Sequence, residues 1–136
     1  MFPKQTRILI ADDMPAEREL LRSLLVELGF TSIVETTNGA EAFLHLEVAC
    51  IANEEIELVI TDWNMPEMNG LELLQKIRGE PRVAKVPTLM LTSIGESGQV
   101  IHAIKAGVSD YIVKPVTKDT LERKLATVWV KVGKKA

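Results

Sequence analysis

The sequence has few of the residues on which disulfide-bonded, membrane-spanning or nucleic-acid-binding proteins depend. One cysteine, Cys50, among 136 residues excludes an internal disulfide framework and a zinc site made of clustered cysteines. No apolar run approaches the roughly 20 residues that span a bilayer, and the first residues lack the apolar core of a signal peptide. The formal charge of −3 disfavours sequence-independent nucleic-acid binding, which needs basic residues to neutralise phosphates. We therefore expect a cytoplasmic protein that binds neither nucleic acid nor membrane.

The composition is that of one folded domain. Hydrophobic residues make up 46% of the chain and charged residues 26%, which is typical of globular proteins and not of disordered ones. A chain of 136 residues is too short for two ordinary domains and long enough to bury a core without a disulfide or a metal. We predict a single domain over residues 1–136, with its core at about residues 6–132.

Short apolar runs alternate with longer amphipathic segments. The runs predicted as strands are Arg7–Ala11, Ser32–Thr36, Leu58–Thr61, Thr88–Leu91 and Tyr111–Val113. The first helical pattern places Leu20, Leu21, Leu24, Leu25 and Leu28 on one side, and a later one is marked by Val100, Ile101 and Ile104. Asn69 and Thr117 are candidate helix caps, and the acidic residues 51–57 are either the last turns of a helix or a surface loop. Five strands alternating with five helices predict an α/β fold with a parallel sheet covered on both faces.

Polar residues that could take part in catalysis or metal binding follow the predicted strands. They are Asp12 and Asp13 after the first strand, Asp62 after the third, Thr92 and Ser93 after the fourth, and Lys114 and Pro115 after the fifth. The carboxyl ends of parallel strands meet at one edge of a sheet, so these side chains should converge. Clustered carboxylates repel one another unless a cation joins them, and an all-oxygen cluster suits Mg²⁺. A carboxylate can also accept a phosphoryl group to form an aspartyl phosphate.

Other residues that could carry chemistry are interpreted as structural or solvated. His45 and His102 lie in helical patterns with no partner at metal-ligand spacing. Cys50 is interpreted as a small apolar residue and Trp129 as a packing residue of the last helix.

The residues at the strand ends resemble the receiver domain of two-component response regulators, over essentially the whole chain. The markers are Ala11-Asp12-Asp13, Asp62-Trp63-Asn64-Met65-Pro66 with Asn69-Gly70, Thr92-Ser93, and Lys114-Pro115, in the family's order and spacing. The sequence is most similar to the stand-alone chemotaxis regulators called CheY-like. The resemblance implies a flavodoxin-like (βα)5 fold with a five-stranded parallel sheet in the order 2-1-3-4-5.

The resemblance also implies a role for each site residue. Asp62 would be the phosphoacceptor, and Mg²⁺ would be held by Asp12, Asp13, Asp62 and the backbone carbonyl of Asn64. Lys114, joined to Pro115 by a cis bond, would contact the phosphoryl group. Thr92 and Tyr111 would form the switch pair that reports phosphorylation.

The function that follows is that of a phosphorylation-activated response regulator in chemotaxis. The phosphodonor would be a sensor histidine kinase (CheA-like), and the output would be binding of a target protein through the face of the fourth helix, fifth strand and fifth helix. We expect a monomer or weak homodimer that catalyses only its own phosphoryl transfer and slow aspartyl-phosphate hydrolysis, and that is otherwise not an enzyme.

Departures from the chemotaxis pattern keep a second reading open. Ile94 stands where these regulators commonly carry an acid, and Gly95-Glu96-Ser97-Gly98 stands where they commonly carry basic residues. Together with Asn64, Ile94 is therefore expected to modulate the lifetime of the phosphorylated state. The segment between Gly39 and Asp62 is also several residues longer than usual. The alternative is a phosphorelay protein or another single-domain receiver outside chemotaxis.

Three other functions fit the residues less well. A flavodoxin needs a phosphate loop where Asp12-Asp13 stands, and a phosphatase of the haloacid dehalogenase type needs an acid where Asn64 stands. The Gly-rich loop of a P-loop nucleotide hydrolase is absent from the sequence.

Overall fold

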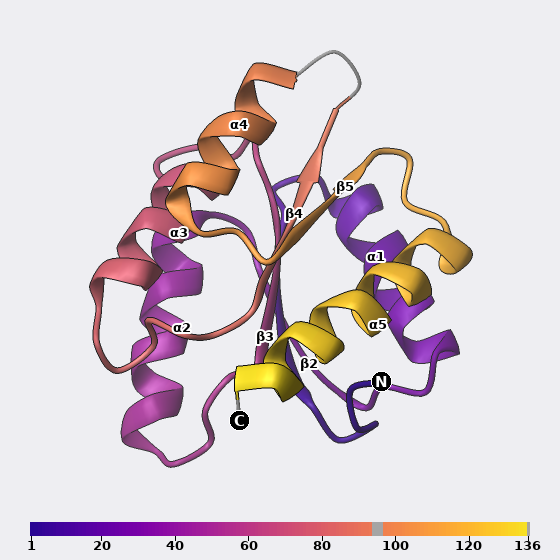
Figure 1. The fold of residues 1–136 in the computed structure, drawn as a ribbon, viewed down its shortest axis with the longest axis horizontal. Helices are drawn as coiled ribbons and strands as arrows, with labels where there is room; N and C mark the ends of the chain where they lie inside the picture. Colours follow the sequence, from indigo (N-terminus) through magenta and orange to yellow (C-terminus); the bar gives the residue numbers. More distant parts are fainter. Residues whose placement is uncertain (94–96, 136) are drawn as a thin grey trace.

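The computed structural model describes residues 1–93 and 97–135, which form a parallel sheet between two layers of helices (Figure 1). The strands are β1 (Arg7–Ala11), β2 (Ser32–Thr36), β3 (Leu58–Asp62), β4 (Thr88–Thr92) and β5 (Asp110–Val113). The helices are α1 (Pro15–Glu27), α2 (Gly39–Ile51), α3 (Gly70–Gly79), α4 (Ser97–Ala106) and α5 (Lys118–Lys135). All neighbouring strands pair in parallel, in the order β2-β1-β3-β4-β5. The predicted flavodoxin-like (βα)5 topology is therefore confirmed.

The two faces of the sheet are covered by different helices. Figure 1 shows α1 and α5 on one side of the sheet and α2, α3 and α4 on the other. Successive side chains of a strand point to opposite faces, so Ile8 and Ile10 join the core under α1 and α5 while Leu9 and Ala11 join the core under α2 and α3. Burial on both faces explains why β1, β3 and β4 are nearly unbroken apolar runs in the sequence, whereas the edge strands β2 and β5 are only partly buried.

Local hydrogen bonds fix where several helices begin. The side chain of Asn69 accepts from the N–H of Glu72 at 2.9 Å while Glu72 accepts from the N–H of Asn69 at 3.1 Å, which makes a capping box at the start of α3. Thr117 accepts from the N–H of Thr120 at 3.2 Å and so caps α5 as predicted. None of the helices within residues 1–93 and 97–135 has both the length and the hydropathy to cross a membrane.

The structure adds detail to two of the predicted segments, the leucine side of α1 and the acidic segment after α2. Leu20, which the pattern places on the same side as the other leucines of α1, is 47% exposed. At about 100° per residue it lies at the flank of the stripe whose centre is taken by Leu21, Leu24 and Leu25. The acidic segment 53–57 is a surface connection, because α2 ends at Ile51.

The outer face of α4 is also more apolar than the helical pattern suggested. Ile101 and Ile104 are 56% and 61% exposed, whereas Ala103 is buried against the sheet. Two of the three residues that mark this helix in the sequence, Ile101 and Ile104, therefore point away from the core, while Val100 is half-buried.

Arg78, near the end of α3, ties together segments on either side of β4. Its guanidinium donates to the backbone carbonyl oxygens of Gly107, Ala84 and Val86 at 3.0, 3.1 and 2.6 Å. Burial lowers the pKa of Arg78. The carboxyl end of α4 is thus fixed to α3 and to the loop before β4.

The start of α3 lies in van der Waals contact with the end of β3. A methyl group on Gly70 would overlap the backbone carbonyl oxygen of Asp62 and lie 2.9 Å from the sulfur of Met90. The N–H of Gly70 donates to the carbonyl of Trp63 at 2.8 Å. Only glycine fits this position without moving the backbone next to Asp62.

Gly70→Ala is expected to lower the free energy of unfolding by about 2 kcal/mol, the cost of overpacking a close contact. Gly79→Ala, at the other end of the same helix, is the matched control, because a methyl group there meets nothing within 4 Å and alanine favours helix. Urea denaturation of both variants measures the difference. Equal midpoints for the two variants would show that the contact at Gly70 relaxes without cost.

Candidate functional site

The candidate site lies at the carboxyl edge of the sheet, where four strand ends meet. Asp12 follows β1, Asp62 ends β3, Thr92 ends β4 and Lys114 follows β5. The register pairs Asp62 with Leu91 and Thr92 with Val113, so β3, β4 and β5 end side by side. The convergence predicted from the sequence is therefore observed.

Three carboxylates form a cluster at this edge. One oxygen each of Asp12, Asp13 and Asp62 lies within 4.8 Å of the others. Asp12 and Asp62 are buried, and Asp13 is half-buried. The Oδ1 of Asp12 accepts from the N–H of Met14 at 2.9 Å, but its buried Oδ2 has no hydrogen-bond partner within the described residues.

Burial and mutual repulsion make this cluster unfavourable while it is charged. Burial, helped by the charges of Asp62 and Glu17, raises the pKa of Asp12 to about 6, against the lowering effects of the hydrogen bond from Met14 and the charge of Lys114. Burial also raises the pKa of Asp62, although Lys114 opposes that rise. An oxygen cluster with an unpartnered buried oxygen fits a hard divalent cation such as Mg²⁺.

Lys114 is the cation of the site. Its Nζ lies 2.9 Å from Oδ1 of Asp62 and 2.6 Å from Oε2 of Glu17. Burial alone lowers the pKa of Lys114, but the two ion pairs outweigh that effect and hold the pKa above its usual value. The bond between Lys114 and Pro115 is cis, as predicted.

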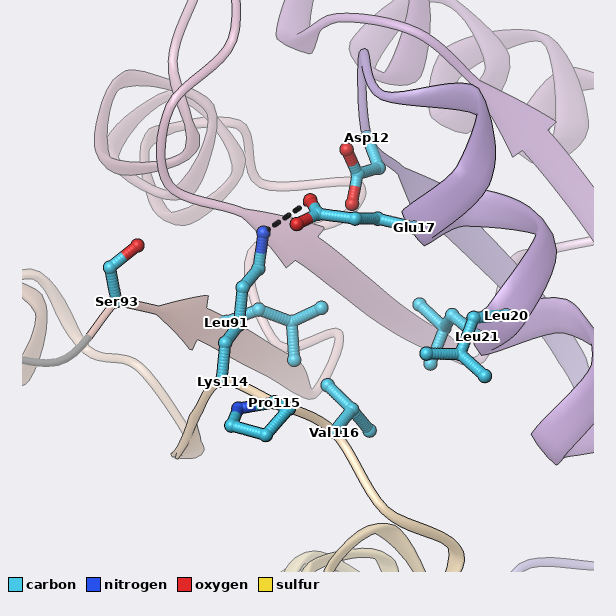
Figure 2. A pocket seen from close by; sticks show the side chains of 9 residues that line it. All are labelled: Asp12, Glu17, Leu20, Leu21, Leu91, Ser93, Lys114, Pro115 and Val116. Atoms are coloured by element: carbon cyan, nitrogen blue, oxygen red, sulfur yellow. Dashed lines mark hydrogen bonds and ion pairs between the residues drawn. The ribbon is translucent and has the colours of Figure 1, made fainter.

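Glu17 is a site residue that the sequence interpretation missed. It belongs to the first turn of α1 and reaches back over the strand ends to Lys114 (Figure 2). The available signal was its position five residues after Asp12, since the helix that follows a parallel strand starts at the same edge of the sheet.

An apolar pocket adjoins the site. It has a volume of about 390 Å³ and opens between α1 and the segment after β5 (Figure 2). Its apolar wall is made of Leu20, Leu21, Leu91, Pro115 and Val116, and its polar lining is made of Asp12, Glu17, Ser93 and Lys114. Leu20, which is exposed on the flank of α1, therefore contributes to the wall of this pocket.

The predicted switch residues lie on neighbouring strands. Thr92 is 1% exposed, and its hydroxyl has no hydrogen-bond partner in the part of the chain that the structure describes. Tyr111 is half-buried on β5 beside the cluster of Trp63, Met90 and Ala103. Lys124 of α5 lies 5.0 Å from the centroid of its ring and pairs with Asp110 at 3.0 Å.

The remaining candidates are not among the side chains that form this cluster in the described residues. Asn64 is exposed in the connection after β3, and Ile94 falls outside the described residues. His45 and His102 are exposed on α2 and α4, and neither belongs to a group of metal-ligating side chains among residues 1–93 and 97–135. Cys50 is a half-buried free thiol, and Trp129 packs against Phe2 with ring centroids 5.1 Å apart.

Asp12→Asn is expected to stabilise the metal-free protein at pH 7, because it removes a buried charge. The pKa of Asp12 is about 6 in the folded protein against 3.8 for an unperturbed aspartate, so the folded state binds its proton more tightly than the unfolded chain does. This group should therefore lower the free energy of unfolding by about 1 kcal/mol as the pH rises from 5 to 7.

Urea denaturation in EDTA at both pH values measures this effect. Asp12→Asn should lack that part of the pH dependence, whereas Glu19→Gln, an exposed charge change on α1, should retain it. The same pH dependence in Asp12→Asn and the wild type would contradict the assignment.

Comparison with known proteins identifies relatives of the chain. The family model of the response regulator receiver domain matches residues 8–126. The chemotaxis protein CheY1 of Helicobacter pylori is 42% identical over 122 residues, which cover 90% of this chain and 95% of that protein. A chemotaxis protein CheY homolog of Campylobacter jejuni is 43% identical over 122 residues, covering 90% of this chain and 91% of that one.

Solved structures agree with these relatives. The chemotaxis response regulator CheY4 of Vibrio cholerae superimposes with a TM-score of 0.80 at 26% identity, over 91% of this chain and 98% of that chain. The family model and the close relatives each cover most of the sequence, including all four strand ends that build the site. The chain therefore belongs to the family of response regulator receiver domains.

Proposed function

We propose that Asp62 accepts a phosphoryl group from a histidine kinase and that this transfer activates the regulator. The observation that carries the proposal is the Asp62 carboxylate itself, which lies in the acidic cluster with the Lys114 ammonium 2.9 Å from its Oδ1. Lys114 offsets the charge of the carboxylate and is placed to contact a phosphoryl oxygen. Membership of the receiver family supports the same role for Asp62.

The transfer is an in-line displacement at phosphorus. A carboxylate oxygen of Asp62 forms the new bond, and the bond between phosphorus and the imidazole nitrogen of the donor histidine breaks. The bonding electron pair stays on that nitrogen. Hydrolysis of the aspartyl phosphate by water then returns the free carboxylate and inorganic phosphate. We propose no other enzymatic activity for the protein.

We propose that Asp12, Asp13 and Asp62, with the backbone carbonyl of Asn64, hold Mg²⁺ for this step. The three carboxylates offer oxygens within 4.8 Å of one another, and the unpartnered Oδ2 of Asp12 is a ligand atom in need of a cation. When bound, Mg²⁺ supplies positive charge that offsets the charge of the transferring phosphoryl group.

The signal is proposed to leave the site through Thr92 and Tyr111. A phosphoryl group on Asp62 adds acceptor oxygens, toward which the buried Thr92 hydroxyl can turn. Its movement opens space for the half-buried ring of Tyr111. The face of α4, β5 and α5 would then change shape around Val100, Val113 and Lys124, next to the exposed Ile101. That face is the proposed binding site for the target protein.

Chemotaxis is the proposed pathway, with a CheA-like kinase as donor. The support comes from relatives at 42% and 43% identity that are named as chemotaxis proteins. Both are matched over nine tenths of their length or more. No comparable observation favours a phosphorelay outside chemotaxis. A monomer or weak homodimer is the proposed state of the protein.

Asp62→Asn should abolish phosphorylation, because an amide oxygen is a poor nucleophile. In the wild type, acetyl phosphate with Mg²⁺ should add one acid-labile phosphoryl group, detected by intact mass or by a phosphate-affinity gel, and EDTA should prevent it. Asp119→Asn, an exposed position on α5, is the control and should label like the wild type. Equal labelling of Asp62→Asn and the wild type would contradict the role of Asp62 as phosphoacceptor, and labelling in EDTA would contradict the need for Mg²⁺.

Thr92→Ala should separate occupancy of the site from the response. Beryllofluoride mimics the phosphoryl group on Asp62, and in the wild type it should shift NMR signals in the pocket, at Tyr111 and along α4. Thr92→Ala should keep the pocket shifts and lose most of those at Tyr111, whereas Thr127→Ala on α5 should respond like the wild type. If wild-type shifts never reach Tyr111, the proposed output face is wrong.

A further inference from the structure

Glu17 is placed to influence the phosphoryl site without belonging to the carboxylate cluster. Its Oε2 lies 2.6 Å from Nζ of Lys114, closer than the 2.9 Å between that Nζ and Asp62. The side chain of Lys114 is 19% exposed and that of Glu17 is 44% exposed, so the contact is shielded from solvent on the lysine side only. We propose that Glu17 is a positioning residue that competes with the phosphoryl group for the ammonium of Lys114.

The competition follows from the number of donors. An ammonium group has three N–H donors. In the structure Lys114 is within hydrogen-bond distance of both Glu17 and Asp62. While both contacts persist, at most one donor remains for a phosphoryl oxygen. Release of Glu17 makes a second donor available, so the same lysine can hold the phosphoryl group more tightly.

Contacts between α1 and the sheet keep Glu17 in this position. Arg18, the next residue, donates from Nη1 to the backbone carbonyl of Asp12 at 2.8 Å and pairs with Glu35 of β2 at 3.3 Å. The same helix is packed onto the sheet through Leu21, Leu24 and Leu25. The first turn of α1 is therefore attached to the edge of the sheet at which Lys114 emerges (Figure 2).

The negative charge of Glu17 also lowers the affinity of the site for a phosphoryl group, as its use of a Lys114 donor does. Glu17 adds a fourth carboxylate to a site where Asp12, Asp13 and Asp62 already face one ammonium. A phosphoryl group on Asp62 brings further negative charge. The carboxylate of Glu17 therefore lowers the affinity of the site for a phosphoryl group, both by occupying a donor and by repulsion.

The inference rests on the proposed role of Asp62 and is tested by binding of the phosphoryl mimic. Beryllofluoride is titrated at saturating Mg²⁺ and fixed pH into the wild type, Glu17→Gln and Glu19→Gln, with the fluorescence of the tryptophans, including Trp63 beside Asp62, as the readout. Glu17→Gln should bind the mimic about threefold to tenfold more tightly, the effect of one partly screened charge at close range. Glu19→Gln, the same charge change two residues along α1, should bind like the wild type.

A second pair of variants tests whether Glu17 acts through Lys114. In a Lys114→Ala background, Glu17→Gln should gain much less affinity for beryllofluoride than it gains in the wild-type background. Equal gains in both backgrounds would overturn the competition for the ammonium. Equal affinities of the wild type and Glu17→Gln would also overturn it while leaving the role of Asp62 intact. A wild type that does not bind beryllofluoride at all would instead refute the proposed function, and this inference with it.

Discussion

The ammonium of Lys114 compensates carboxylates that the parallel sheet forces together. Because β1 and β3 are neighbours and run in the same direction, their carboxyl ends bring Asp12 and Asp62 to one edge with no freedom to separate. Burial makes this arrangement costly for the charged forms, as the pKa of about 6 for Asp12 indicates. Lys114 reaches the cluster from the far side of β4 and offsets only part of that charge. The remaining negative potential is what makes the site suitable for a cation.

The rest of the fold keeps this unfavourable site in place. Each central strand is buried on both faces, so the positions of the strand ends follow from the packing of two apolar cores. The connections that follow the strands are equally constrained: a capping box starts α3, and Gly70 allows that helix to touch the carbonyl of Asp62. Stability is therefore supplied by the cores, at a distance from the residues that carry the chemistry.

The pattern of the sequence was sufficient to predict alternating strands and helices and the acidic cluster, whereas the strand order followed from the resemblance to receiver domains. Strand runs, caps and the acids after β1 and β3 are local features, and parallel topology brings the strand ends together. Side-chain direction is harder to predict. Leu20 and Ile104 differ from buried neighbours by one position on a helix, which turns them outward. Glu17 went unrecognised because its partner Lys114 lies 97 residues away, and only the packing of α1 onto the sheet brings the two together.

Arg78 has a mechanical consequence for signalling. Its guanidinium holds the carbonyl of Gly107, at the carboxyl end of α4, together with two carbonyls of the loop before β4. Because arginine stays protonated at any pH at which proteins fold, this anchor does not loosen with acidity. The helix is thus fastened at the end remote from Thr92. A displacement of α4 should therefore be smaller at the end held by Arg78 than at the end that begins at Ser97.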